Sequence, residues 1–189
     1  SQFGDGTADV IEMQFDLPDF LPPHTQPQST SDLSVLHEMV HVMQAQNSYY
    51  GDIVGDGSSQ ATWFKEGIAS FSFGEDSRVA AILASNGNDY ASLNAAIGTG
   101  NESWASAEQY ASSYLAVKYL HSRIVASGYA DGIKHMTTWM KTQFDASSGA
   151  HSSGIHAYFT TFSIYKDGGG AFFADADFIS EFKGSNGQA

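Results

Sequence analysis

His37 and His41 are separated by one turn of a helix, and Glu38 lies beside the first of them in the run His37-Glu38-Met39-Val40-His41. On a helix, side chains at positions i and i+4 have Cβ atoms about 6 Å apart, so both imidazoles can point at one ion. Imidazole nitrogen is a common ligand of Zn²⁺. Glu38 would lie next to a water on the metal and could accept its proton. The spacing therefore predicts a hydrolytic zinc site.

The helix that must position these residues is predicted over 33–45, where apolar residues occupy almost every side. The polar residues recur at spacings of three and four and form one stripe on an otherwise buried helix; they are Ser34, His37, Glu38, His41 and Gln44. Buried polar groups need partners. In the alternative interpretation, the histidines are core residues satisfied by hydrogen bonds. This interpretation is the weaker of the two, because two histidines and a carboxylate lie together in one apolar helix.

A catalytic zinc usually has three protein ligands and an open fourth position. The chain has no cysteine, which leaves His, Asp or Glu for the third ligand. The longer pattern with a third histidine on the same helix is excluded, because Gln44 and Asn47 occupy the required positions. Glu66 is the leading candidate, since a charge in the apolar aromatic segment 62–71 needs a counter-charge.

Two alternatives to this ligand remain open. Lys65 and Glu66 could form an ion pair on a solvated face. Asp52 and Asp56 are nearer to the histidines in sequence, but they lie in a Gly-rich loop, so we rank them lower.

The composition limits the classes of partner. The chain has 189 residues, with 8 Lys and Arg against 21 Asp and Glu and a formal charge of −13 at pH 7. Nucleic acids and anionic membranes bind basic surfaces, so we expect neither as a partner. The sequence has no apolar run of membrane-span length and no signal-peptide pattern. We expect a single domain over 1–189, excised or processed from a longer chain because it begins at Ser1.

Apolar periodicity predicts the remaining elements. Residues 11–17 alternate between apolar and polar, which is typical of a half-buried strand. A Pro-rich stretch follows, and residues 29–32 offer N-caps for the metal helix. Helices are predicted at 61–71, 76–85, 90–97, 106–127, 132–144, 155–163 and 173–182. His135, His151 and His156 are expected to face solvent.

Residues 37–41 followed by Trp63-Phe64-Lys65-Glu66-Gly67 resemble the gluzincin peptidases of the bacterial collagenase type, in which a W-F-x-E-G segment supplies the third zinc ligand. The low-charge, cysteine-free flanks are also similar to the flagellinolysins, peptidase domains inserted in the variable region of some flagellins. The resemblance implies an α+β, mainly helical fold, with a small N-terminal sheet and a helical C-terminal part flanking the active-site cleft. It further implies Ca²⁺ as an additional ion, and an extracellular location on the bacterial flagellum as part of a flagellin-type filament.

Tyr110 and Tyr114 lie on one stripe of the predicted helix 106–127, and His121 lies too far along that helix to share a site with Tyr110. The resemblance favours a tyrosine as hydrogen-bond donor to the oxyanion, with Tyr110 the better match and Tyr114 the second candidate. Alternatively, both are core aromatics. Relatives carry Asp or Glu four residues after the ligand glutamate, where this chain has Ser70, so we expect weaker metal binding than in the relatives.

We therefore expect a zinc-dependent endopeptidase that hydrolyses extended protein or peptide substrates, with His37, His41 and Glu66 as ligands and Glu38 and Tyr110 as catalytic residues. The chief alternative is a non-catalytic, zinc-stabilised surface domain of an extracellular filament. An exopeptidase would need a charged pocket for a chain terminus, and the sequence indicates no residue for one.

Overall fold

The computed structural model describes residues 28–55, 61–101, 106–147 and 154–185. These residues form helices α1 (Gln28–Asn47), α2 (Thr62–Phe73), α3 (Asp76–Ser85), α4 (Tyr90–Ala95), α5 (Ala107–Ala126), α6 (Ile133–Ser147), α7 (Ile155–Phe162) and α8 (Asp175–Gly184), with a short 3-10 helix, η2 (Tyr50–Asp52), after α1. No helix in this part of the chain is long and apolar enough to cross a membrane.

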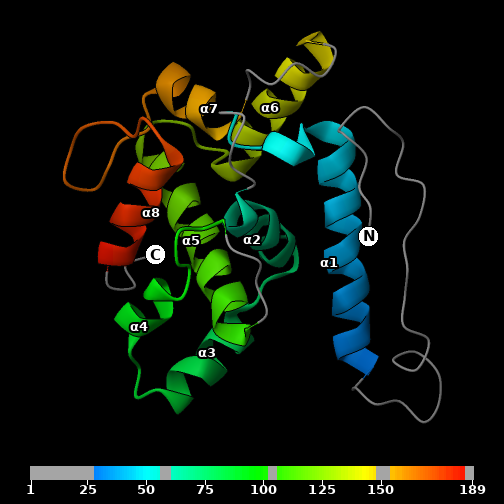
Figure 1. Cartoon of the computed structure of the whole chain (residues 1–189), viewed down its shortest axis with the longest axis vertical. Coiled ribbons are helices and arrows are strands. Elements are labelled where there is room, and N and C mark those ends of the chain that lie inside the picture. The colour runs from blue at the N-terminus through cyan, green and yellow to red at the C-terminus, as the bar shows by residue number, and fades with distance from the viewer. Residues whose placement is uncertain (1–27, 56–60, 102–105, 148–153, 186–189) are drawn as a thin grey trace.

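Helix α5 is the centre of the molecule (Figure 1). It packs against α2, α3, α4, α6 and α8, while α1 lies at the edge and contacts α2 and α6. The start of α5 is fixed by a capping box, in which Ser106 Oγ accepts from Gln109 N and the Gln109 side chain accepts from Ser106 N. This start matters because Tyr110 lies in the first turn of α5.

The α2–α5 contact is close because of a glycine. A Cβ atom built on Gly67 would lie 2.5 Å from the carbonyl oxygen of Ser113 and 2.5 Å from Val117 Cγ2. Such distances are far inside van der Waals contact. Gly67 therefore lets the main chain of α2 rest directly on α5, next to Glu66.

Helix α2 is also anchored to the far end of the chain. Trp63 is fully buried, its Nε1 donates to Asp175 Oδ1 over 2.7 Å, and its ring stacks on Phe178 with centroids 4.7 Å apart. At the other end, Gly74 has a φ of +80° and its N–H donates to Ser70 O, which ends α2 and starts the turn into α3.

The expected α+β class is wrong. The described residues contain helices and one isolated antiparallel bridge, Tyr165 to Ala171, but no strand. Apolar residues in this part of the chain recur with helical spacing, which no sheet could bury on one face. The predicted strand 11–17 lies outside the described residues, and the expected cleft beside a sheet is instead bordered by helices.

Helix α1 is less buried than its composition suggests. Four of its large apolar side chains are exposed: Leu33, Leu36, Met39 and Met43. The opposite face carries His41 and Ala45, which are buried. Because α1 lies at the edge of the bundle, only its polar stripe and one flank face the rest of the described chain.

Candidate metal centre

His37, His41 and Glu66 converge from two helices. His37 Nε2 lies 2.8 Å from Glu66 Oε2, His41 Nε2 lies 3.3 Å from the same oxygen, and the two Nε2 atoms are 3.0 Å apart. The one-turn spacing on α1 places both imidazoles on one face, and α2 brings the carboxylate to that face. Among the described residues, these three form the one group of His, Asp or Glu side chains that could hold a metal ion.

The donor set fits a zinc ion. Ligand atoms of a tetrahedral site with bonds of about 2.0–2.1 Å lie about 3.3 Å from one another. The three observed separations of 2.8, 3.0 and 3.3 Å require only a small outward movement to reach that spacing. Two imidazole nitrogens and one carboxylate oxygen are also a ligand set typical of catalytic zinc.

Gln44 orients His41. The Gln44 Oε1 atom is an acceptor, so His41 donates to it from Nδ1 over 2.9 Å, and the neutral ring then keeps its lone pair on Nε2. The Gln44 amide in turn donates to Lys65 O over 3.2 Å. Sequence reasoning assigned no such role to Gln44, although its place in the polar stripe, three residues after His41, was the available signal.

Ser70 does not serve as the buttress of a histidine. Its side chain is fully buried, and its Oγ has no hydrogen-bond partner among the described residues. Support for one imidazole therefore comes from Gln44 on α1 itself, rather than from Ser70 on α2.

The centre is electrostatically coupled. Burial alone would raise the pKa of Glu66, but hydrogen bonds from His37 and from His41, which donates from Nε2 when its imidazole is protonated, lower it to about 2. Burial alone would lower the pKa of His41, but the hydrogen bond and charge of Glu66 raise it above its usual value of 6.5. The Glu66 carboxylate is therefore charged at neutral pH, so a metal ion would not have to displace a proton from it.

Lys65 does not form a solvated pair with Glu66. The lysine is buried, and its Nζ lies 4.2 Å from the centroid of the Tyr50 ring. Burial lowers its pKa to about 8. Asp52 is buried in η2, where it accepts from Gly55 N, and it is not part of the group; Asp56 lies outside the described residues.

A cleft of about 240 Å³ opens beside His37. Its lining combines apolar, charged and aromatic side chains: Leu33, Ser34, His37, Glu38, Phe73, Glu75, Arg78 and Tyr110. Glu38 thus faces the same cleft as His37, the one member of the converging group that lines it.

The structure distinguishes the two candidate tyrosines. Tyr110 lines the cleft, and its ring centroid lies 6.0 Å from that of His37. Burial and the charges of Glu66 and Glu38 raise its pKa. Tyr114 instead donates from its hydroxyl to Asp76 Oδ1 over 2.9 Å, on the side of α3. Only Tyr110 lies at the cleft.

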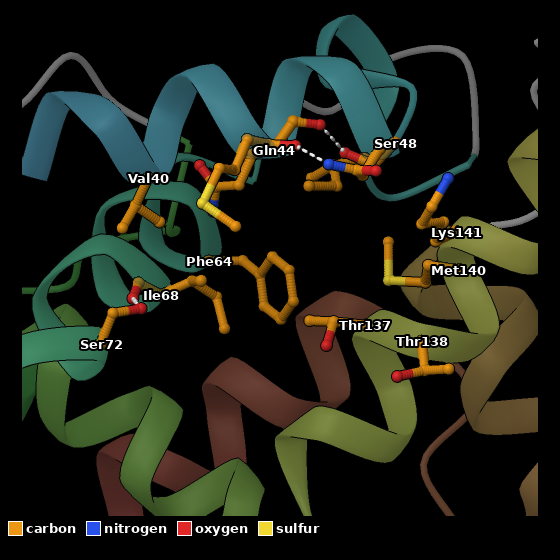
Figure 2. Close-up of a pocket in the computed structure, with 13 residues that line it drawn as sticks. Val40, Gln44, Ser48, Phe64, Ile68, Ser72, Thr137, Thr138, Met140 and Lys141 are labelled. Carbon is orange, nitrogen blue, oxygen red and sulfur yellow. Dashed lines mark hydrogen bonds between the residues drawn. The ribbon is translucent and has the colours of Figure 1, made fainter.

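A second, larger cavity of about 420 Å³ lies between α1, α2 and α6. Figure 2 shows Val40 and Gln44 of α1 facing Phe64 and Ile68 of α2, with Met140, Thr137 and Thr138 of α6 along the third side. None of the three converging side chains lines it. Gln44 lines this cavity and also contacts His41.

A comparison with protein-family models decides the class of the protein. The model described as collagenase matches residues 23–148, about two thirds of the chain. The chain belongs to the collagenase family of peptidases. The match spans the whole of α1 to α6, and so contains every residue of the centre and the cleft. No curated protein and no solved structure matched the chain.

Membership of the collagenase family confirms the expected collagenase-type peptidase, and with it a hydrolase acting on protein or peptide substrates. The family is one of metallopeptidases, which implies zinc, and the converging group provides a fitting site. Calcium gains no support, because the described residues contain no second group of this kind.

The other histidines that the structure describes are not part of the converging group. His135 was expected to face solvent, and this is wrong: its Nδ1 lies 2.7 Å from the Tyr158 hydroxyl and its ring stacks on Tyr129. His156 is half-buried, and His121 Nδ1 accepts from Ile133 N. His151 lies outside the described residues.

Proposed function

We propose that this protein is a zinc-dependent endopeptidase of the gluzincin class that hydrolyses peptide bonds in extended protein substrates. The observation that carries the proposal is the convergence of His37, His41 and Glu66 beside a cleft lined by Glu38 and Tyr110. Three protein ligands of this kind would leave the fourth position of a tetrahedral zinc site for water or substrate.

When bound, zinc would act as a Lewis acid that acidifies a water and polarises the substrate carbonyl. The chain supplies the rest. Glu38 accepts the proton from the attacking water and delivers it to the leaving amine. Tyr110 donates a hydrogen bond to the oxygen on which negative charge develops. Gln44 holds His41 in the tautomer that presents Nε2 to the metal.

Endopeptidase action is supported by the charges around the cleft. Arg78 is the one cation among the described residues that line it, and its guanidinium is paired with Glu75 over 2.9 Å. A cleft without an unpaired cation has no group to bind the terminal carboxylate of a substrate. Cleavage within an extended segment needs no such cation.

The decisive experiment compares Glu38→Gln with the wild type on a mixture of peptides, with zinc content measured in parallel. We expect the variant to lose at least about 10³-fold in kcat/KM while it retains zinc, because only the base is removed. Glu108→Gln, an exposed carboxylate in the first turn of α5, serves as the matched control. If Glu38→Gln and the wild type were equally active, Glu38 would not be the base. If the zinc-loaded wild type cleaved no peptide, the protein would not be an enzyme, and the alternative of a non-catalytic filament surface domain would take the place of this proposal.

We also infer that the domain acts outside the cell, as a flagellinolysin-like part of a flagellin-type filament. The support is compositional: no cysteine, few basic residues and a charge of −13. Antibody labelling of intact filaments, with proteolysis assayed on the same preparation, tests this location. Activity found only inside cells would contradict it.

A further inference from the structure

Glu75 and Arg78 stand at the end of the cleft as an ion pair that the mechanism above does not use. Gly74 ends α2, so α3 begins at once and places residues 75 and 78, three apart, on the same side of its first turn. Glu75 occupies the N-cap position of α3, yet its side chain makes no capping hydrogen bond. Its carboxylate is committed to Arg78 instead.

The Glu75 carboxylate is buried and forms an ion pair with Arg78. The residue is 6% exposed, its Oε1 accepts from Arg78 Nη2 over 2.9 Å, and its Oε2 is buried with no hydrogen-bond partner among the described residues. A buried carboxylate is costly unless a cation compensates it. Arg78 is that cation; its side chain is 40% exposed, and the ion pair with Glu75 restrains its guanidinium.

The restrained guanidinium lies against Tyr110. The Arg78 Cζ atom is 5.5 Å from the centroid of the Tyr110 ring, within the range of a cation–π contact. The centroid of His37 lies 6.0 Å from the same ring at an interplanar angle of 73°. The Tyr110 ring is therefore contacted both by the His37 imidazole of α1 and by the Arg78 guanidinium of α3.

We propose that Arg78, anchored by the buried Glu75, is a positioning residue that fixes the ring of Tyr110 for hydrogen-bond donation in the cleft. This inference rests on the proposed function of Tyr110. Oxyanion stabilisation depends on a donor that is already in place when charge develops, and a ring free to tilt loses that advantage. The residue acts through Tyr110, and not through contact with the substrate.

A neighbouring trio provides a matched control. Lys118 Nζ lies 5.4 Å from the centroid of Tyr114 and 3.1 Å from Asp76 Oδ1, so a cation, a tyrosine and a carboxylate meet there as well. This trio is one turn further along α5, and none of its members lines the cleft. Lys118→Gln therefore removes a comparable cation from a comparable ring outside the site.

The test is a double-mutant cycle in the zinc-loaded protein. We expect Arg78→Gln to lower kcat about 10-fold with KM changed less than about twofold, and Arg78→Lys to restore part of the loss, since a cation returns to the ring without the planar fork. In the Tyr110→Phe background, Arg78→Gln should cause no further loss. Lys118→Gln should leave kcat unchanged. A loss from Arg78→Gln that persists in Tyr110→Phe would overturn the proposal, because Arg78 would then act on the substrate directly.

A second measurement does not depend on activity. In protein labelled with ¹³C-tyrosine, the ring signal that disappears in Tyr110→Phe identifies Tyr110. Arg78→Gln should shift and broaden this signal, and Lys118→Gln should leave it in place; an unchanged signal in Arg78→Gln overturns the proposal. If Arg78→Gln did not fold, Glu75→Gln would test the same anchor. A zinc-loaded wild type that cleaves no peptide would instead refute the proposed function, while the ring signal still reports on Arg78.

Discussion

His41 donates a hydrogen bond from Nδ1 to Gln44 Oε1 over 2.9 Å, and this contact turns its Nε2 toward Glu66. Because the acceptor lies on the same helix, α1 carries both a candidate imidazole ligand and the group that orients it. The helix therefore presents two side chains of the candidate metal centre, and α2 adds the carboxylate.

Gln44→Ala should weaken zinc binding about 10- to 100-fold, because the imidazole loses the partner that fixes its tautomer and orientation. Competition with a chromophoric chelator measures the zinc Kd. Gln46→Ala, on the exposed side of the same helix, should leave the Kd unchanged. Equal affinities in Gln44→Ala and Gln46→Ala would show that His41 needs no such partner.

Tyr110→Phe should lower kcat about 10- to 1000-fold with little change in KM, because the hydroxyl is used when the oxyanion forms. Tyr114→Phe should keep kcat, since its hydroxyl donates to Asp76 away from the cleft. Steady-state kinetics on one cleaved peptide compares the two. A larger loss in Tyr114→Phe would reverse the assignment.

Much of this arrangement could be predicted from local patterns. The metal-helix stripe is a matter of 3.6-residue periodicity, which depends on neighbours in sequence alone, and α3 lies at the predicted residues 76–85. Glu66 stood out as a charge among apolar residues. The start of α1 was predicted five residues too late, because residues 29–32 are polar enough to cap a helix but here lie within its first turns.

The features that escaped prediction depend on contacts between segments distant in sequence. The role of Gln44 depends on its hydrogen bonds to the His41 ring and to the main-chain oxygen of Lys65 on α2. The role of Gly67 exists only because Ser113 of α5 lies against it. The burial of Glu75 and its pairing with Arg78 likewise follow from how α2 and α3 pack, for which periodicity gives no signal.

The metal-free protein should show a pH window of added stability. The pKa of Glu66 is lowered from 4.5 to about 2, so its contribution to stability is present above pH 4.5 and is lost as the pH falls toward 2. The pKa of His41 is raised above 6.5, so its contribution is present below pH 6.5 and is lost as the pH rises through the raised value. Both contributions coexist between pH 4.5 and 6.5.

Glu66→Gln should therefore lower the free energy of unfolding of the metal-free protein most in this window, by about 1.5–3 kcal/mol. Urea unfolding between pH 3 and 9 measures the difference, with Glu108→Gln as an exposed control. The same Glu66→Gln variant should fail to retain zinc on dialysis. A difference from the wild type that did not vary with pH would mean that the two groups do not interact.

Gly67→Ala should destabilise the protein by about 1–3 kcal/mol, because the new methyl group would meet main-chain atoms that cannot rotate away. Gly184→Ala is the control, since a Cβ there meets nothing within 4 Å and alanine favours the helix by about 0.5–1 kcal/mol. Thermal unfolding of both variants checks the contrast. Equal midpoints would show that α2 and α5 can separate at little cost.

The absence of a side chain at residue 67 also determines what can vary in relatives of this protein. The separation of α2 and α5 beside Glu66 is set by Gly67 against the main chain of Ser113 and the side chain of Val117. Substitutions at other positions between these helices can then accumulate without altering how far Glu66 stands from Tyr110 in the first turn of α5. The absence of a methyl group at residue 67 thus sets the spacing of the two helices at the site, and it leaves the surrounding core free to diverge.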